Sequence, residues 1–181
     1  MNKTVILIVG PSGAGKTALG DFFKLHGLHE IISVSTRKPR PNESEGNPYY
    51  FISEKQFNQY KEQDQLAEYV EYKGIYYGVT IEEVNTKLDK HGTLFCIVIK
   101  EGMEQFKTKF PDAQVLFVTS SIDTMVERMK YRGNTAEEIE KRLEGILEES
   151  IPIKEADFVI YNNSTLDELY SKGLSYLDSL R

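Results

Sequence analysis

Residues 5–17, VILIVGPSGAGKT, decide the fold of this chain. They begin with five apolar residues, Val5 to Val9, which predict one buried β-strand. Gly10 to Thr17 then match the pattern G-x-x-x-x-G-K-[ST] of a phosphate-binding loop, and residues 18–25 carry apolar side chains at helical spacing. The order strand, glycine-rich loop, helix is the context in which this motif binds the phosphates of a nucleoside triphosphate.

The residue types of the loop explain this chemistry. Its glycines let the backbone approach an anion without Cβ clashes, so that loop N–H groups and the helix N-terminus can point at phosphate oxygens. Lys16 supplies a positive charge to the outer phosphates, and the Thr17 hydroxyl can ligate Mg²⁺. The alternative is a glycine-rich turn before an ordinary helix. We predict a triphosphate site at Gly10, Pro11, Ser12, Gly13, Ala14, Gly15, Lys16 and Thr17.

Length and composition bound the remaining possibilities. The chain has 181 residues, which suits one domain with inserted subdomains, and its 40% apolar and 28% charged residues indicate a globular protein with a core. The net charge of −6 argues against a nucleic-acid surface. The single cysteine, Cys96, lies in an apolar run and is expected to be buried and inert. The sequence shows no signal peptide and no membrane span, so we expect a cytoplasmic protein.

Strands and helices alternate along most of the chain, which predicts an α/β fold: a parallel sheet with helices on both faces and the ligand at the carboxyl ends of the strands. Further strands are expected at 30–35, 49–52, 66–73, 74–79, 93–99, 113–118 and 158–161, and further helices at 54–61, 81–88, 101–110, 121–131, 137–149 and 166–177. Two insertions interrupt the core (about 1–32, 81–130 and 150–181): a tyrosine-rich β lobe at about 33–80 and a lid at about 131–149.

Each insertion carries basic residues that suit anions. Arg37 and Arg40 lie in a proline-rich loop, where they form either a second phosphate site or a solvated charge run. Arg128 and Arg132 are four residues apart and share a helix face, and Arg142 follows them; they form either an anion clamp or cations that complement a helix dipole. In the lobe, strict alternation over 66–73 would place Leu66, Glu68, Val70 and Tyr72 on one face.

Seven stretches taken together, in this order and spacing, resemble guanylate kinases over nearly the whole chain. They are GPSGAGKT at 10–17, SVSTRKPR at 33–40, YYF at 49–51, AEY at 67–69, GIYYG at 74–78, ERMKYRG at 127–133 and YNN at 161–163. The resemblance implies a P-loop fold with an acceptor-binding lobe and a helical lid. It also implies phosphoryl transfer from ATP, with Mg²⁺, to a nucleoside monophosphate, most simply GMP or dGMP, by a monomer or homodimer that binds neither nucleic acid nor membrane.

The same resemblance implies roles for individual residues. The acceptor phosphate is held by Arg37, Arg40, Tyr49 and Tyr77, and the acceptor base is contacted by Glu68, by Ser35 (or Ser33) and by the residue at position 79. The lid arginines Arg128, Arg132 and Arg142 act with Lys16 in catalysis, and Asn162 lies near the adenine of ATP.

Three departures leave the base open. Two residues are missing between the serines and Arg37, Val79 replaces a serine or threonine, and Ile97-Val98-Ile99 replaces a D-x-D. Phosphate binding is therefore expected to be intact, whereas an isoleucine cannot read a base edge by hydrogen bonds. Two other functions stay open: a phosphokinase of the same fold that acts on another nucleotide or a ribose bisphosphate, and a non-catalytic guanylate-kinase-like binding module. Such modules typically have a degraded phosphate loop, whereas this one is complete.

Overall fold

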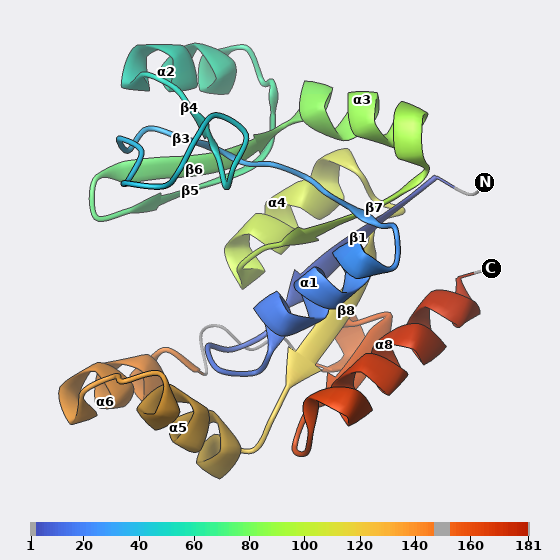
Figure 1. The fold of residues 1–181 in the computed structure, drawn as a ribbon. Coiled ribbons are helices and arrows are strands. Elements are labelled where there is room, and N and C mark those ends of the chain that lie inside the picture. Colours follow the sequence, from blue (N-terminus) through green and yellow to red (C-terminus); the bar gives the residue numbers. More distant parts are fainter. Residues whose placement is uncertain (1–2, 147–152, 181) are drawn as a thin grey trace.

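The computed structural model describes residues 3–146 and 153–180 and has a five-stranded parallel sheet at its centre (Figure 1). Its strands are β1 (Thr4–Val9), β2 (His29–Glu30), β7 (Thr93–Ile97), β8 (Gln114–Thr119) and β9 (Phe158–Tyr161). They are ordered β2-β7-β1-β8-β9, and every neighbouring pair is parallel. The strand that leads into the glycine-rich loop is therefore the middle one, and the predicted parallel α/β core is confirmed.

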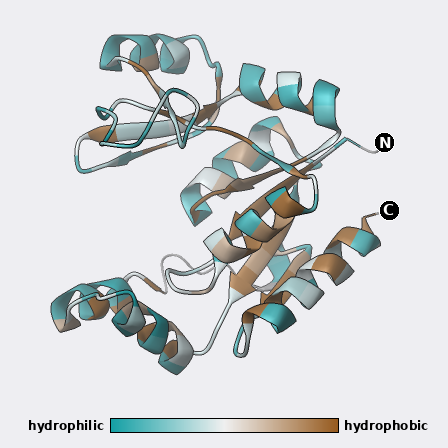
Figure 2. Cartoon of the chain, viewed as in Figure 1, coloured by the Kyte–Doolittle hydropathy of each residue, from teal (hydrophilic) through white to brown (hydrophobic). Residues whose placement is uncertain are grey.

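Helices cover both faces of this sheet because side chains along β1 point alternately to one face and the other. Val5, Leu7 and Val9 pack on the face of α3 (Ile81–His91) and α4 (Lys100–Lys109). Ile6 and Ile8 pack on the face of α1 (Lys16–Leu25) and α8 (Leu166–Ser179). In Figure 2 the central strands are mostly brown, whereas α3 is mostly teal, as expected for a helix with a solvent-facing side. Cys96 is buried in the first of these cores.

The lobe has its own four-stranded mixed sheet, ordered β4-β3-β6-β5. Its strands are β3 (Val34–Ser35), β4 (Tyr50–Phe51), β5 (Leu66–Tyr72) and β6 (Ile75–Thr80). One face is covered by α2 (Glu54–Glu62), from which Phe57 packs on Val34 and Leu66. The lobe lies at the opposite end of the molecule from α5 (Ile122–Tyr131) and α6 (Ala136–Glu144), which pack on each other (Figure 1).

The single strand predicted over 30–35 is wrong, because the chain crosses between the two sheets there. β2 pairs with β7 in the core, whereas β3 pairs with β4 and β6 in the lobe. The crossing is held by side chains of α3: the Glu83 carboxylate accepts the N–H of Ile32 (3.0 Å), and the Lys87 ammonium donates to the carbonyl of Glu30 (2.7 Å). These distant partners satisfy the backbone where a ladder would otherwise have to continue.

The predicted alternation along 66–73 is also wrong at its start. The register shifts between Leu66 and Glu68, as in a β-bulge, so Leu66 pairs with Thr80 whereas Glu68 pairs with Val79. Leu66 packs with the α2 side of the lobe, and Ala67 belongs to the core under α4. A bulge changes which face the following side chains occupy, so Leu66 and Glu68 do not share one.

Smaller differences concern element ends, and the helix expected over 81–88 continues to His91. The strands expected at 49–52 and 93–99 are shorter, at Tyr50–Phe51 and Thr93–Ile97. The helix expected over 137–149 is described as α6 up to Glu144, and residues 147–149 lie outside the described residues. A 3-10 turn (Ile153–Glu155) precedes β9.

Within 3–146 and 153–180 no helix is both long and apolar enough to span a membrane.

Candidate active site

The glycine-rich loop connects the carboxyl end of β1 to α1. Gly10 has φ +148°, and a Cβ there would lie 1.9 Å from the carbonyl oxygen of Val118 on β8, so no other residue fits. The Lys16 ammonium lies inside the loop, where it donates to the carbonyls of Gly10 and Pro11 (3.1 Å to the latter). The loop is thus folded around a positive charge at the N-terminus of a helix, which is the arrangement that binds phosphates.

Two of the three lid arginines reach this loop. Arg142 of α6 donates to the Ser12 hydroxyl (2.7 Å), and Arg128 of α5 donates to the carbonyl of Gly13 (3.4 Å). Desolvation, and next the charge of Arg132, lower the pKa of Arg128. Arg132 itself caps the C-terminus of α5 and is exposed. Lys16, Arg128 and Arg142 therefore converge on the loop from three separate helices.

Asn162 follows β9 and contacts the glycine-rich loop. Its side chain follows β9, is 3% exposed, and donates from Nδ2 to the carbonyl of Ala14 in the loop (2.8 Å). Its Oδ1 accepts from Arg128 (3.2 Å). The amide therefore ties the loop to Arg128. The contact with adenine that the family resemblance implies for Asn162 stays a prediction.

The residues expected to hold an acceptor phosphate gather in the lobe. The Arg37 guanidinium lies 5.1 Å from the ring centroid of Tyr49, whose ring is 5.5 Å from that of Tyr77. Burial raises the pKa of Tyr49, so its hydroxyl stays protonated at neutral pH and can donate a hydrogen bond. Arg40 is exposed on the same loop, and its backbone N–H donates to Glu43 (2.8 Å).

Glu43 is a partner of Arg37 that the sequence reasoning missed. It accepts two hydrogen bonds from Arg37, at 2.6 and 2.8 Å, a bidentate pair that fixes the plane of the guanidinium. These bonds hold the pKa of the Glu43 carboxyl at about 2, well below its usual value. The sequence signal was weak, because two acids, Glu43 and Glu45, follow the arginines in the same proline-rich loop.

Gln105 of α4 was also missed. Its side chain donates to the carbonyl of Tyr69 (2.9 Å) and accepts the N–H of the same residue (3.0 Å). Because β5 is an edge strand of the lobe sheet, this amide takes the place of a missing strand partner and holds β5 against α4. No periodicity in the sequence signals such a contact.

Glu68 is placed by this contact on the core side of the lobe. The residue is 6% exposed, and its Oε2 lies so close to α4 that a Cβ on Gly102 would be 2.7 Å away. Desolvation, and next the charge of Glu101, raise the pKa of Glu68 to about 7. This carboxyl is thus balanced between its two charge states at neutral pH.

Two further residues expected at the acceptor base are enclosed. Val79 and Ser35 are both 0% exposed. Val79 packs into the apolar core under α4, and the Ser35 hydroxyl accepts the N–H of Arg37 (3.3 Å). In this conformation Val79 fills the core and Ser35 shapes the start of the arginine loop. Their predicted contacts with the acceptor base stay predictions.

The site offers few metal ligands of its own. Thr17 is exposed in the first turn of α1, and the described residues contain no group of three or more His, Cys, Asp or Glu side chains that could hold a metal ion. Mg²⁺ is commonly bound by substrate phosphates, waters and one or two protein groups. The donor set therefore fits a metal that arrives with a nucleotide.

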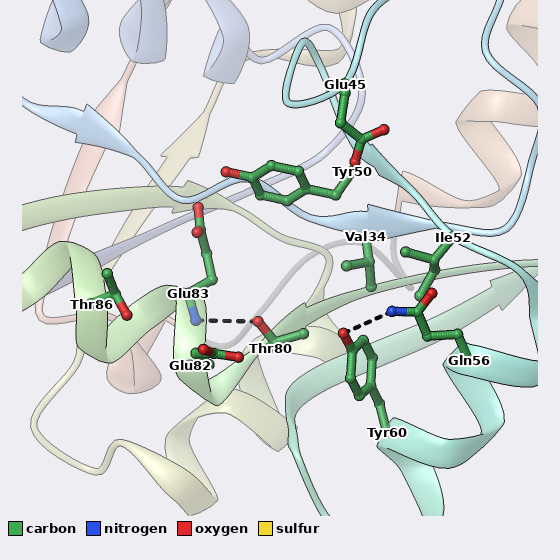
Figure 3. Close-up of a pocket in the computed structure, with 10 residues that line it drawn as sticks. All are labelled: Val34, Glu45, Tyr50, Ile52, Gln56, Tyr60, Thr80, Glu82, Glu83 and Thr86. Atoms are coloured by element: carbon green, nitrogen blue, oxygen red, sulfur yellow. Dashed lines mark hydrogen bonds between the residues drawn. The ribbon is translucent and has the colours of Figure 1, made fainter.

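A cavity of about 350 Å³ lies on the α2 side of the lobe sheet (Figure 3). Its lining includes the rings of Tyr50 and Tyr60 and three acids, Glu45, Glu82 and Glu83. No arginine or lysine among the described residues lines it. Three carboxylates would repel a phosphate, so this cavity is not where a nucleotide would bind.

Comparisons with known proteins agree with this geometry. The guanylate kinase family model matches residues 1–180. A guanylate kinase of Streptococcus thermophilus is 37% identical over 170 residues, which cover 90% of this chain and 81% of that protein. One of Trichodesmium erythraeum is 36% identical over 169 residues, 91% of each chain. The crystal structure of guanylate kinase from Anaplasma phagocytophilum superposes with a TM-score of 0.70 at 22% identity, covering 98% of this chain and 85% of that one, and shows the same fold. The chain belongs to the guanylate kinase family.

Proposed function

We propose that this protein transfers the γ-phosphoryl group of ATP to GMP or dGMP. The observation that carries the proposal is the pairing of a complete phosphate loop with a separate cluster of Arg37, Tyr49 and Tyr77 in the lobe. The loop suits the triphosphate, and the cluster suits the phosphate of an acceptor. The guanylate kinases to which the chain is similar support the choice of a guanine nucleotide.

Each group has a plain chemical task in this reaction. The acceptor phosphate is already anionic at neutral pH, so its oxygen attacks the γ-phosphorus in line without a general base. Catalysis then consists of positioning and charge neutralisation. Arg37, held rigid by Glu43, orients the acceptor, while Lys16, Arg128 and Arg142 neutralise the charge on the transferred group. On ATP binding, the Lys16 ammonium exchanges loop carbonyls for phosphate oxygens.

Mg²⁺ is part of the proposal as a companion of ATP. Thr17 is the residue that would ligate it, and the ion would offset phosphate charge. Ile97 and Ile99 stand where the family resemblance places carboxylates, so the chain contributes little else to the metal. We expect activity to require Mg²⁺ and to disappear with EDTA.

The test is a transfer assay with ATP, Mg²⁺ and a panel of nucleoside monophosphates. GMP or dGMP should be phosphorylated, and Lys16→Ala should lose the activity while keeping its folded circular-dichroism spectrum. Arg40→Ala should raise the KM for the acceptor much more than the KM for ATP. Transfer to no purine nucleotide would reject the proposal, whereas ATP binding without transfer would favour a binding module.

A further inference from the structure

Lys100 is the first residue of α4 and lies at the edge of the central sheet from which the phosphate loop begins. Ile8 of β1 pairs with Ile97 of β7, and the N–H of Val98 donates to the carbonyl of Ile8 (3.2 Å). Beyond this pairing β1 continues into the loop at Gly10, whereas β7 continues into α4. Because the two strands are parallel, their carboxyl ends lie side by side, and so do the starts of the loop and of α4.

The first turns of α4 also lie against the acceptor lobe. A Cβ on Gly102 would be 2.7 Å from Oε2 of Glu68 on β5. Gln105, one turn further along α4, holds the backbone of Tyr69 on the same strand. The helix thus contacts both β1 and β5 (Figure 1). A group at the start of α4 therefore lies between the loop that suits ATP and the lobe that suits an acceptor.

The helix face that carries Lys100 is turned toward the loop. Lys100 and Lys107 are seven residues apart and therefore share a face of α4. The Lys107 ammonium donates to the carbonyls of Pro111 (2.6 Å) and Ala113 (2.8 Å), just before β8, so this face looks toward β8, the neighbour of β1. Helical side chains lean toward the N-terminus of their helix. The Lys100 side chain therefore leans past the start of α4, toward the edge of the sheet where the loop lies.

The stability of α4 does not explain a lysine at this position. A cation in the first turn of a helix opposes the macrodipole, which is positive there. The nearest acids on α4 are Glu101, the next residue, and Glu104, one turn later. Lys100 is half-buried, and no carboxylate within residues 3–146 and 153–180 forms an ion pair with its ammonium. Partial desolvation of an unpaired cation is costly, so this ammonium is available to an anionic ligand.

We propose that Lys100 is a further catalytic residue of the phosphoryl transfer: its ammonium binds the γ-phosphoryl group as this group passes from ATP to the acceptor. The inference rests on the proposed function. In the transfer the bond from the γ-phosphorus to the oxygen of the leaving ADP breaks, and a bond from the acceptor phosphate oxygen forms. Lys100 keeps its proton throughout and stabilises the charge on the moving group.

This position complements the cations already described. Lys16, Arg128 and Arg142 reach the loop from α1, α5 and α6. Lys100 adds a positive charge from a fourth helix, α4, which lies next to the acceptor lobe. A charge placed between donor and acceptor gains most when the phosphoryl group is shared between them, so it lowers the barrier more than it tightens either nucleotide.

The experiment measures kcat and the KM values for ATP and GMP, with Mg²⁺, in Lys100→Gln and Lys100→Arg. Lys100→Gln should lower kcat at least about tenfold and change either KM by no more than about twofold. Its thermal midpoint should be unchanged or higher, because the variant removes a cation from a helix N-terminus. Lys100→Arg keeps the charge and should restore most of kcat.

The matched control is Glu104→Gln, which removes the exposed acid four residues after Lys100 and should leave kcat unchanged. An equal fall of kcat in Glu104→Gln would assign Lys100 to a pair on the helix surface and overturn the inference. A less stable Lys100→Gln whose kcat is not restored in Lys100→Arg would show a structural role and would also overturn it.

The outcomes separate this inference from the proposed function. Lys100→Gln that phosphorylates GMP with the kcat of the unmodified protein would overturn the inference and leave the proposed function standing. A raised KM at unchanged kcat would likewise overturn the inference alone, since Lys100 would then bind a nucleotide without assisting the transfer. Transfer to no nucleoside monophosphate by the unmodified protein would overturn both.

Discussion

Replacing Asn162 by alanine tests how the phosphate loop is held. The change removes the hydrogen bond from Nδ2 to the Ala14 carbonyl (2.8 Å) and the one from Arg128 to Oδ1 (3.2 Å). Losing a buried donor that satisfies a carbonyl costs about 1–3 kcal/mol, and a partly exposed hydrogen bond adds about 1 kcal/mol. We therefore expect Asn162→Ala to lower the free energy of unfolding by about 2–4 kcal/mol.

Urea denaturation followed by circular dichroism measures this loss, and steady-state kinetics measures its effect on the loop. Because Arg128 also loses a partner, kcat should fall together with stability. Asn162→Asp keeps the acceptor for Arg128 but removes the donor to Ala14, so it should still destabilise the protein. The control is Asn85→Ala, an exposed position on α3 where we expect a change within about 0.5 kcal/mol. Equal stability of Asn162→Ala and Asn85→Ala would refute this account of the loop.

Three further predictions follow from single contacts. Gly10→Ala should lower the free energy of unfolding by more than about 3 kcal/mol or prevent folding, because its Cβ would lie 1.9 Å from a carbonyl oxygen. Its control is Gly27→Ala, where φ is +83° but the space around the residue is open. There thermal denaturation should show a loss of only about 1–2 kcal/mol. The pKa of Glu68 is higher in the folded protein than in the unfolded chain. The protonated carboxyl therefore contributes its whole stabilisation below the unfolded-state pKa, and this contribution is lost as the pH rises through about 7. Relative to Glu68→Gln, the free energy of unfolding of the unmodified protein, measured by urea denaturation, should fall by about 3 kcal/mol between about pH 4.5 and 7. The same pH dependence of unfolding in both proteins would contradict this. Arg142→Gln should lower kcat with a smaller effect on the KM for the acceptor, since Arg142 reaches Ser12 of the loop; an unchanged kcat would place it outside the reaction.

The parts of the fold that were predictable depend on local signals. The run of apolar residues before Gly10, together with the loop motif, predicted β1 and its role because strand, turn and helix signals are contiguous there. The crossing at residues 30–35 could not be predicted in this way. Its sequence has no glycine or proline, and Glu83 and Lys87, more than fifty residues away, hold the chain where it crosses.

In the candidate site too, residues within sequence motifs were predicted, whereas their partners from other parts of the chain were not. Arg37, Tyr49 and Tyr77 were predicted from a resemblance spread over the lobe, and the structure brings them together. The partners of these groups were not predicted. The sequence does not tell which acid of the loop pairs with Arg37, and nothing in it signals the contact of Gln105 with Tyr69. The bulge at the start of β5 likewise separates Leu66 from Glu68, although strict alternation predicted one face for both.

The most direct test of the central claim is ATP-dependent phosphorylation of GMP by the purified protein at pH 8 with Mg²⁺, where Glu68 is mostly ionised. We predict formation of GDP and ADP in equal amounts, and none from Lys16→Ala. ATP hydrolysis without GDP, or equal activity of Lys16→Ala, would contradict the claim that the loop and the lobe cooperate in one phosphoryl transfer.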